Sequence, residues 1–160
     1  MGAGYHGGFG KTYGAIAGDA VFRSEPEKYF RNIARRSDID QNGMYDVVAH
    51  GGEAIIQITH DGQCLEINSR TAARMIESRP DYHRGQPIRL LSCNTGSSIY
   101  GFAQNLANKM NVVVEAPTKM VWAYPNGRYI VAGVIASDPP RPNLNDRGTF
   151  VRFYPGGNRR

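Results

Sequence analysis

Hydrophobic residues fall into short runs along the chain, and their spacing alternates between that of strands and that of helices. Two stretches carry apolar residues at helical spacing together with suitable start signals. In a third, Ser24 and Glu27 form a capping box, and Pro26 suits the first helical turn. Helices are therefore predicted over residues 24–40, from Asn68 or Ser69 to Ser78, and over Ile99–Met110.

The remaining apolar runs are short and bounded by turn residues, as strands are. "HDGQ" and "YPNG" are typical of hairpin turns, whereas the Pro-rich segment 137–148 is expected to be an irregular loop. Strands are predicted over Met44–Ala49, Ala54–Thr59, Cys64–Ile67, Ile88–Leu91, Val112–Val114, Lys119–Ala123, Arg128–Ala132 and Thr149–Tyr154.

This order of elements indicates an α/β fold, a three-layer sandwich with a mixed, partly parallel central sheet and added β-hairpins. A right-handed crossover places the strands Met44–Ala49 and Ile88–Leu91 parallel and favours them as neighbours. The glycines near the N-terminus indicate a flexible arm. We expect an arm over residues 1–18, a single α/β catalytic domain over 19–157 and a basic tail over 158–160.

Composition is consistent with one soluble domain: 160 residues, of which 41% are hydrophobic and 21% charged. No apolar run approaches the roughly 20 residues of a membrane helix. The net charge of +5 comes from residues spread along the chain, which argues against a nucleic-acid partner. The two cysteines, Cys64 and Cys93, form no CxxC motif, so neither a metal nor another cofactor is expected, and Cys64 is predicted to lie in the core.

Candidate chemistry lies at the ends of two predicted strands. "YDVVAHGG" ends a strand at His50, and "IRLLSCNTG" ends another at Cys93. Sites of open α/β sheets lie at the carboxyl ends of strands, so His50 is a candidate base for a Cys93 nucleophile. The N–H groups of Gly51, Gly52 and Cys93 are candidate oxyanion donors, and the dipole of the following helix could favour the thiolate.

Three further side chains are candidates for polar support of this pair: Ser92, Asn94 and Thr95. Asp46 and Glu53 flank the histidine strand, and either could orient His50.

This pair of motifs resembles the caspase-like cysteine peptidases, in which a strand ending in His-Gly is followed by a strand ending in Cys. The resemblance covers Met44 to Val114, although Ser92 stands where that group often has Ala or Gly. It implies a caspase-like fold, with His50 as the acid/base and Cys93 as the nucleophile of a peptidase.

A second resemblance covers Ile88 to Gly157, which is similar to C-terminal effector domains of bacterial polymorphic toxins of the Rhs-repeat type. It implies a secreted or injected domain that acts on a protein substrate in the cytoplasm of a target cell and has a cognate immunity protein. The activity could also be self-processing of the toxin.

Three alternatives remain open at this point. The same His/Cys pair could serve a protein glutamine deamidase. "GYHGG" is similar to the opening motif of some ADP-ribosyltransferases, although the other residues that those enzymes need cannot be assembled here. A non-catalytic binding module is the third alternative.

Overall fold

The computed structural model describes residues 28–39, 43–60 and 63–156. The predicted N-terminal arm and basic tail, and the capping box at Ser24, lie outside these residues, so the predicted division of the chain stays a prediction. The described part is α/β, with one mixed, partly parallel sheet and two antiparallel sheets.

The mixed sheet has four strands in the order β1 (Tyr45–Val48), β5 (Ile88–Leu91), β6 (Val114–Pro117) and β10 (Phe150–Phe153). The first three strands are parallel, and β10 pairs antiparallel with β6. All residues of β1 and β5 are buried, as expected for strands that are covered on both faces. The predicted parallel, adjacent pairing of β1 and β5 is therefore confirmed.

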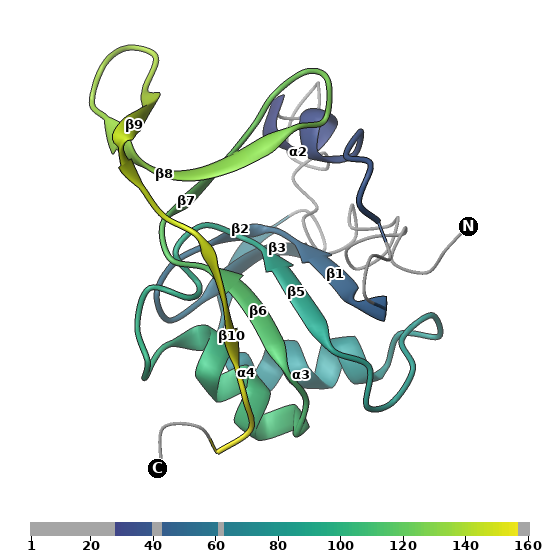
Figure 1. The fold of residues 1–160 in the computed structure, drawn as a ribbon. Helices are drawn as coiled ribbons and strands as arrows, with labels where there is room; N and C mark the ends of the chain where they lie inside the picture. Colours follow the sequence, from purple (N-terminus) through teal and green to yellow (C-terminus); the bar gives the residue numbers. More distant parts are fainter. Residues whose placement is uncertain (1–27, 40–42, 61–62, 157–160) are drawn as a thin grey trace.

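Different elements cover the two faces of this sheet (Figure 1). The helices α3 (Ser69–Glu77) and α4 (Phe102–Met110) pack on one face around a large apolar core, which includes Tyr45, Val47 and Leu90. The helix α2 (Lys28–Ile33) packs on the other face, where Phe30 and Ile33 contact Val48 and Leu91. Because side chains alternate along a strand, successive residues of β1 and β5 pack into the cores on opposite faces of the sheet.

Two antiparallel sheets complete the described fold. One contains β2 (His50–Gly51), β3 (Ile56–His60) and β4 (Gln63–Ile67), and the other contains β7 (Met120–Ala123), β8 (Tyr129–Ile135) and β9 (Arg141–Arg147). In both, the hairpin predicted from turn composition is present.

Three predictions about local structure are wrong. Segment 137–148 was predicted to be an irregular loop, but it contains β9, whose pairing with β8 overrides its composition. The helix predicted from Ile99 begins at Phe102, because residues 92–101 form a loop of turns. Cys64 was predicted to be in the core, but it is exposed, as is every residue of β4 except Ile67, so most of this strand is covered on neither face.

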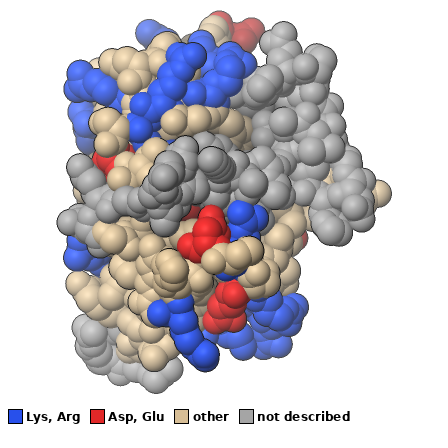
Figure 2. All heavy atoms as spheres, turned by 90° about the vertical axis from the view of Figure 1, so that its right-hand side faces the viewer, with Lys and Arg blue, Asp and Glu red and all other residues tan. Residues whose placement is uncertain are grey.

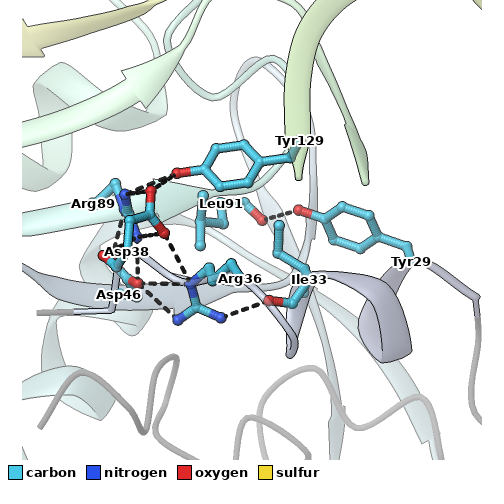
Figure 3. Close-up of polar contacts among 8 residues, drawn as sticks. All are labelled: Tyr29, Ile33, Arg36, Asp38, Asp46, Arg89, Leu91 and Tyr129. Atoms are coloured by element: carbon cyan, nitrogen blue, oxygen red, sulfur yellow. Dashed lines mark hydrogen bonds and ion pairs between the residues drawn. The ribbon is translucent and has the colours of Figure 1, made fainter. Parts of the chain in front are cut away.

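A buried ionic network joins β1, β5 and the segment after α2 (Figure 3). Asp46 and Arg89 are directly paired in the β1–β5 register, and the guanidinium binds both carboxylate oxygens, at 2.8 and 2.6 Å. Arg36 donates to the same carboxylate at 2.7 Å and to the Ile33 carbonyl at 2.9 Å. The side chains of Asp46 and Arg36 are each 1% exposed, so both charges depend on this pairing.

Asp38 and Tyr129 complete the network. Arg89 donates to the Asp38 carboxylate and to the Tyr129 hydroxyl, each at 2.9 Å, and that hydroxyl also bonds to Asp38. Burial alone would raise the pKa of Asp38, but the hydrogen bonds from Arg89 and Tyr129 outweigh it and hold that pKa below its ordinary value. The two arginines and two aspartates balance in charge, and they tie α2 and β8 to the strands of the mixed sheet.

We expect Asp46→Ala to lower the free energy of unfolding by about 3–5 kcal/mol, because it leaves two buried guanidinium groups without their shared carboxylate. The matched control is Glu115→Ala, which removes the partner of Arg152 in a more exposed ion pair and should cost about 0–1 kcal/mol. Urea unfolding at neutral pH measures both. Equal losses for the two variants would contradict the importance assigned to the network.

Candidate active site

His50 and Cys93 follow two adjacent parallel strands at the same level. Val48 is the Cα partner of Leu91, so each candidate residue lies two positions beyond the last paired residue of its strand. Both are therefore at the carboxyl end of the mixed sheet, as the sequence predicts. Both are half-buried.

Both side chains lie on the face of the sheet that α2 covers. The ring of His50 contacts Phe30 edge-on, with centroids 5.0 Å apart, and lies 6.2 Å from the ring of Tyr29. Tyr29 donates a hydrogen bond of 2.8 Å to the Leu91 carbonyl, two residues before Cys93. Burial raises the pKa of the Tyr29 hydroxyl well above its ordinary value, and the nearby Cys93 sulfur adds to the rise. Tyr29 therefore lies beside the ring of His50 and is bonded to the end of β5, two residues before Cys93.

The backbones next to these residues are also in contact, at Gly51. A Cβ atom added there would lie 2.9 Å from the Ser92 Cβ, 2.9 Å from the Thr95 Cγ2 and 3.1 Å from the Cys93 carbonyl oxygen. No side chain fits in that space without displacing the loop. The glycine at this position thus lets the histidine segment lie directly against the cysteine loop.

The Cys93 sulfur lies beside the backbone of Val121 in β7. The Val121 N–H donates to Sγ at 3.3 Å, and the thiol faces the Val121 carbonyl oxygen at 3.9 Å. Burial raises the pKa of Cys93 above its ordinary value, although the N–H groups of Val121 and of Cys93 itself oppose the rise. The resting group is therefore the neutral thiol, and a base is needed to form the thiolate.

The helix whose dipole was predicted to favour the thiolate is α4, and its first two N–H groups have partners other than the sulfur. The first two N–H groups of α4 donate to the carbonyls of Glu53, at 2.7 Å, and Thr95, at 3.0 Å. These bonds satisfy the start of the helix and link it to both loops of the site. The N–H group that reaches the sulfur comes from Val121 instead.

The candidate oxyanion donors differ in availability. The Gly52 N–H donates to the Ile55 carbonyl at 2.9 Å, so the prediction that it is a free donor is wrong. In an antiparallel ladder, hydrogen-bonded pairs alternate with non-hydrogen-bonded pairs. Gly52 and Ile55 are hydrogen-bonded, so the neighbouring pair of Gly51 and Ile56 is a non-hydrogen-bonded one. The Gly51 N–H is therefore turned away from β3, and it is the better donor of the two.

The predicted support residues mainly shape the loop. Ser92 is fully buried, and its hydroxyl has no hydrogen-bond partner among the described residues. Asn94 has a φ of 63° and donates its N–H to the Lys119 carbonyl at 3.0 Å, while the Thr95 hydroxyl donates to the Ser92 carbonyl. These bonds fix the loop that carries Cys93.

Neither proposed carboxylate is shown to orient His50. Both oxygens of Asp46 bind arginines, and the side chain of Glu53 is exposed. Sequence reasoning did not identify Tyr29 or Val121 as neighbours of the sulfur. Tyr29 was visible only as part of an apolar helix face, and Val121 acts through its backbone, which leaves no signal in the sequence.

Two hollows of about 580 and 520 Å³ lie away from His50 and Cys93. One is beside the β7–β8 turn, and the other is next to the C-terminus of α4. Among the described residues, no group of three or more His, Cys, Asp or Glu side chains is placed to hold a metal ion. No helix in that part of the chain has both the length and the apolar character to cross a membrane.

Comparison with known proteins identifies one family. The model of a domain of unknown function, DUF8616, matches residues 19–131, which is more than half of the chain, so the chain belongs to that family. The matched segment includes both His50 and Cys93. No curated protein and no solved structure matches the chain.

We expect Gly51→Ala to destabilise the fold by about 1–3 kcal/mol, because the added methyl group would be forced into Ser92 and Thr95. Gly52→Ala is the matched control: a Cβ there meets nothing within 4 Å, so its effect should stay within about 0.5 kcal/mol. Urea unfolding measures the free energy of unfolding of both variants. If they lose the same stability, the two loops do not pack as described.

The raised pKa of Cys93 predicts a loss of stability at alkaline pH. The folded state holds the thiol proton more tightly than the unfolded chain, so this contribution is complete below the unfolded pKa of about 8.5 and is lost as pH rises through the folded pKa. Between pH about 7.5 and 10, the unfolding free energy should fall further for the wild type than for Cys93→Ala. Identical pH slopes would show that the thiol is not desolvated.

Proposed function

We propose that this member of the DUF8616 family is a cysteine-dependent hydrolase, a peptidase with Cys93 as nucleophile and His50 as acid/base. The observation that supports it is the equivalent position of the two residues beyond adjacent parallel strands, on a face where Tyr29 lies beside His50 and is bonded to the strand end that precedes Cys93. Two unrelated structural residues would have no need to follow adjacent strands, at the same level and on the same face of the sheet.

The proposed reaction begins with a proton transfer from the Cys93 thiol to the imidazole of His50. The thiolate attacks the carbonyl carbon of a peptide bond, and the N–H groups of Gly51 and Cys93 stabilise the oxyanion. The C–N bond then breaks, and the imidazolium protonates the leaving amine. Water hydrolyses the thioester with His50 as base, which releases the carboxylic acid and restores the thiol.

The surroundings of the sulfur leave the resting thiol poorly reactive. A half-buried, neutral thiol that is hydrogen-bonded to Val121 is a weak nucleophile. Exposed Cys64 is therefore expected to react faster with a general alkylating reagent, so simple alkylation is a poor test. Turnover of a substrate is the informative measurement.

Further parts of the proposal come from the resemblances in the sequence. A three-layer, caspase-like arrangement is compatible with helices on one face of the mixed sheet and α2 on the other. The toxin-like C-terminal half supports an effector or self-processing domain that acts on a protein in a target cell, with an immunity protein as partner.

A protein glutamine deamidase is the second candidate, because the same thiol and imidazole would attack a side-chain amide and release ammonia. The positions of His50 and Cys93 support both reactions equally. The products separate them, since a peptidase creates a new N-terminus and a deamidase converts glutamine to glutamate.

The test exposes a peptide library derived from a bacterial proteome to wild type, Cys93→Ala, His50→Ala and Cys64→Ser. Mass spectrometry records new N-termini and conversion of glutamine to glutamate. Wild type and Cys64→Ser should be active, His50→Ala should be slower by a factor of about 10²–10⁴, and Cys93→Ala should be inactive.

Circular dichroism confirms that each variant is folded. Activity that persists in folded Cys93→Ala, or the absence of both products with wild type, would refute the proposed hydrolase.

A further inference from the structure

The hollow of about 580 Å³ beside the β7–β8 turn lies apart from His50 and Cys93. Its size is within the range of binding pockets. Tyr124, Arg128 and Ile130 come from the hairpin, and Leu144 and Arg147 come from β9. Of the seven residues that line it, the only charged ones are the two arginines.

The hairpin side of this hollow is held in place by α2 and the turn after it. Arg35 donates to the Pro125 carbonyl at 3.0 Å, and Asn32 donates to the Ala123 carbonyl at 3.0 Å. Gly127 has a φ of 90°, and a Cβ there would lie 2.2 Å from the Arg35 carbonyl oxygen. The tip of the hairpin is therefore packed directly onto the body of the protein.

The opposite side is shaped by an irregularity in the β8–β9 ladder. Ala132 pairs with Arg147, but the next residue, Gly133, pairs with Asn143, so β9 bulges between them. A Cβ at Gly133 would lie 2.3 Å from an Asp146 carboxylate oxygen, and that carboxylate pairs with Lys119 at 3.1 Å. Bulges of this kind redirect side chains, and this one carries Leu144.

The surface around the hollow is apolar and basic together. Leu144 is 59% exposed and Tyr124 is 38% exposed, and Val134 and Ile135 on β8 are also exposed. Figure 2 shows Lys and Arg side chains gathered in the upper part of one face, at the height of α2 and the β7–β8 hairpin in Figure 1. Exposed apolar patches mark interaction sites, and tyrosine and arginine are the residues that most often dominate binding energy there.

We propose that this hollow binds an acidic segment of a protein partner that also carries apolar side chains. Arg128 and Arg147 would pair with carboxylates, since guanidinium groups bind them with two hydrogen bonds. Ile130 and Leu144 would contact the apolar side chains of the same segment. Single-stranded nucleic acid fits less well, because it stacks on successive aromatic rings and the hollow offers only Tyr124 among the residues that line it.

The test uses the full chain and a fluorescein-labelled peptide in which glutamates alternate with leucines, with binding measured by fluorescence anisotropy. Arg128→Glu with Arg147→Glu should weaken binding at least about tenfold, and Leu144→Ser about threefold or more. The matched control is Arg70→Glu with Arg74→Glu, which makes the same charge change at exposed positions on α3 and should change affinity less than about threefold.

Three results would overturn the proposal. One is equal weakening by both double variants, which would reveal attraction by net charge alone. Another is equal or tighter binding of a peptide with lysine in place of glutamate, or of oligothymidylate. The third is no detectable binding of the acidic peptide to wild type.

Discussion

The contact on which the described structure depends is the buried pair between Asp46 of β1 and Arg89 of β5. These residues are direct partners in the strand register, and a shift of one residue would move the carboxylate to the apolar core under α3 and α4. Because Arg36 and Tyr129 join the same network, it also holds α2 and β8 against the sheet. The register fixed in this way sets His50 and Cys93 at the same level.

The site combines close packing of its two loops with a thiol that is poorly reactive at rest. Gly51 brings the histidine segment against the cysteine loop. The Asn94 N–H donates to the Lys119 carbonyl and the Thr95 carbonyl accepts from Ala103 of α4, and these bonds join the loop to its surroundings. Burial keeps the Cys93 thiol protonated, while the Val121 N–H supplies a donor to the sulfur. Such a thiol requires a partner base. In our proposal this base is His50, which follows the strand adjacent to that of Cys93.

The sequence predicted what depends on local pattern and failed where long-range contacts decide. The apolar run of β5 and the Asn68 cap of α3 were both recognisable, and the parallel pairing followed from the handedness of the crossover. The β9 strand was missed because its Pro-rich composition is typical of a loop, whereas its strand structure comes from pairing with β8. Cys64 was misplaced because the sequence does not show that most of β4 is covered on neither face. The roles of Tyr29 and the Val121 backbone depend on elements that are distant in sequence.

The most direct test of the central claim is an engineered disulfide between the two candidate positions. With His50→Cys and Cys64→Ser together, the chain has two thiols, the new one at position 50 and Cys93. Positions 50 and 93 follow adjacent strands at the same level, so their side chains can form a disulfide if both lie on one face of the sheet. The account predicts that mild oxidation of the folded protein links them, with loss of both free thiols by mass spectrometry. Two thiols that remain free under conditions that oxidise exposed cysteines would contradict it.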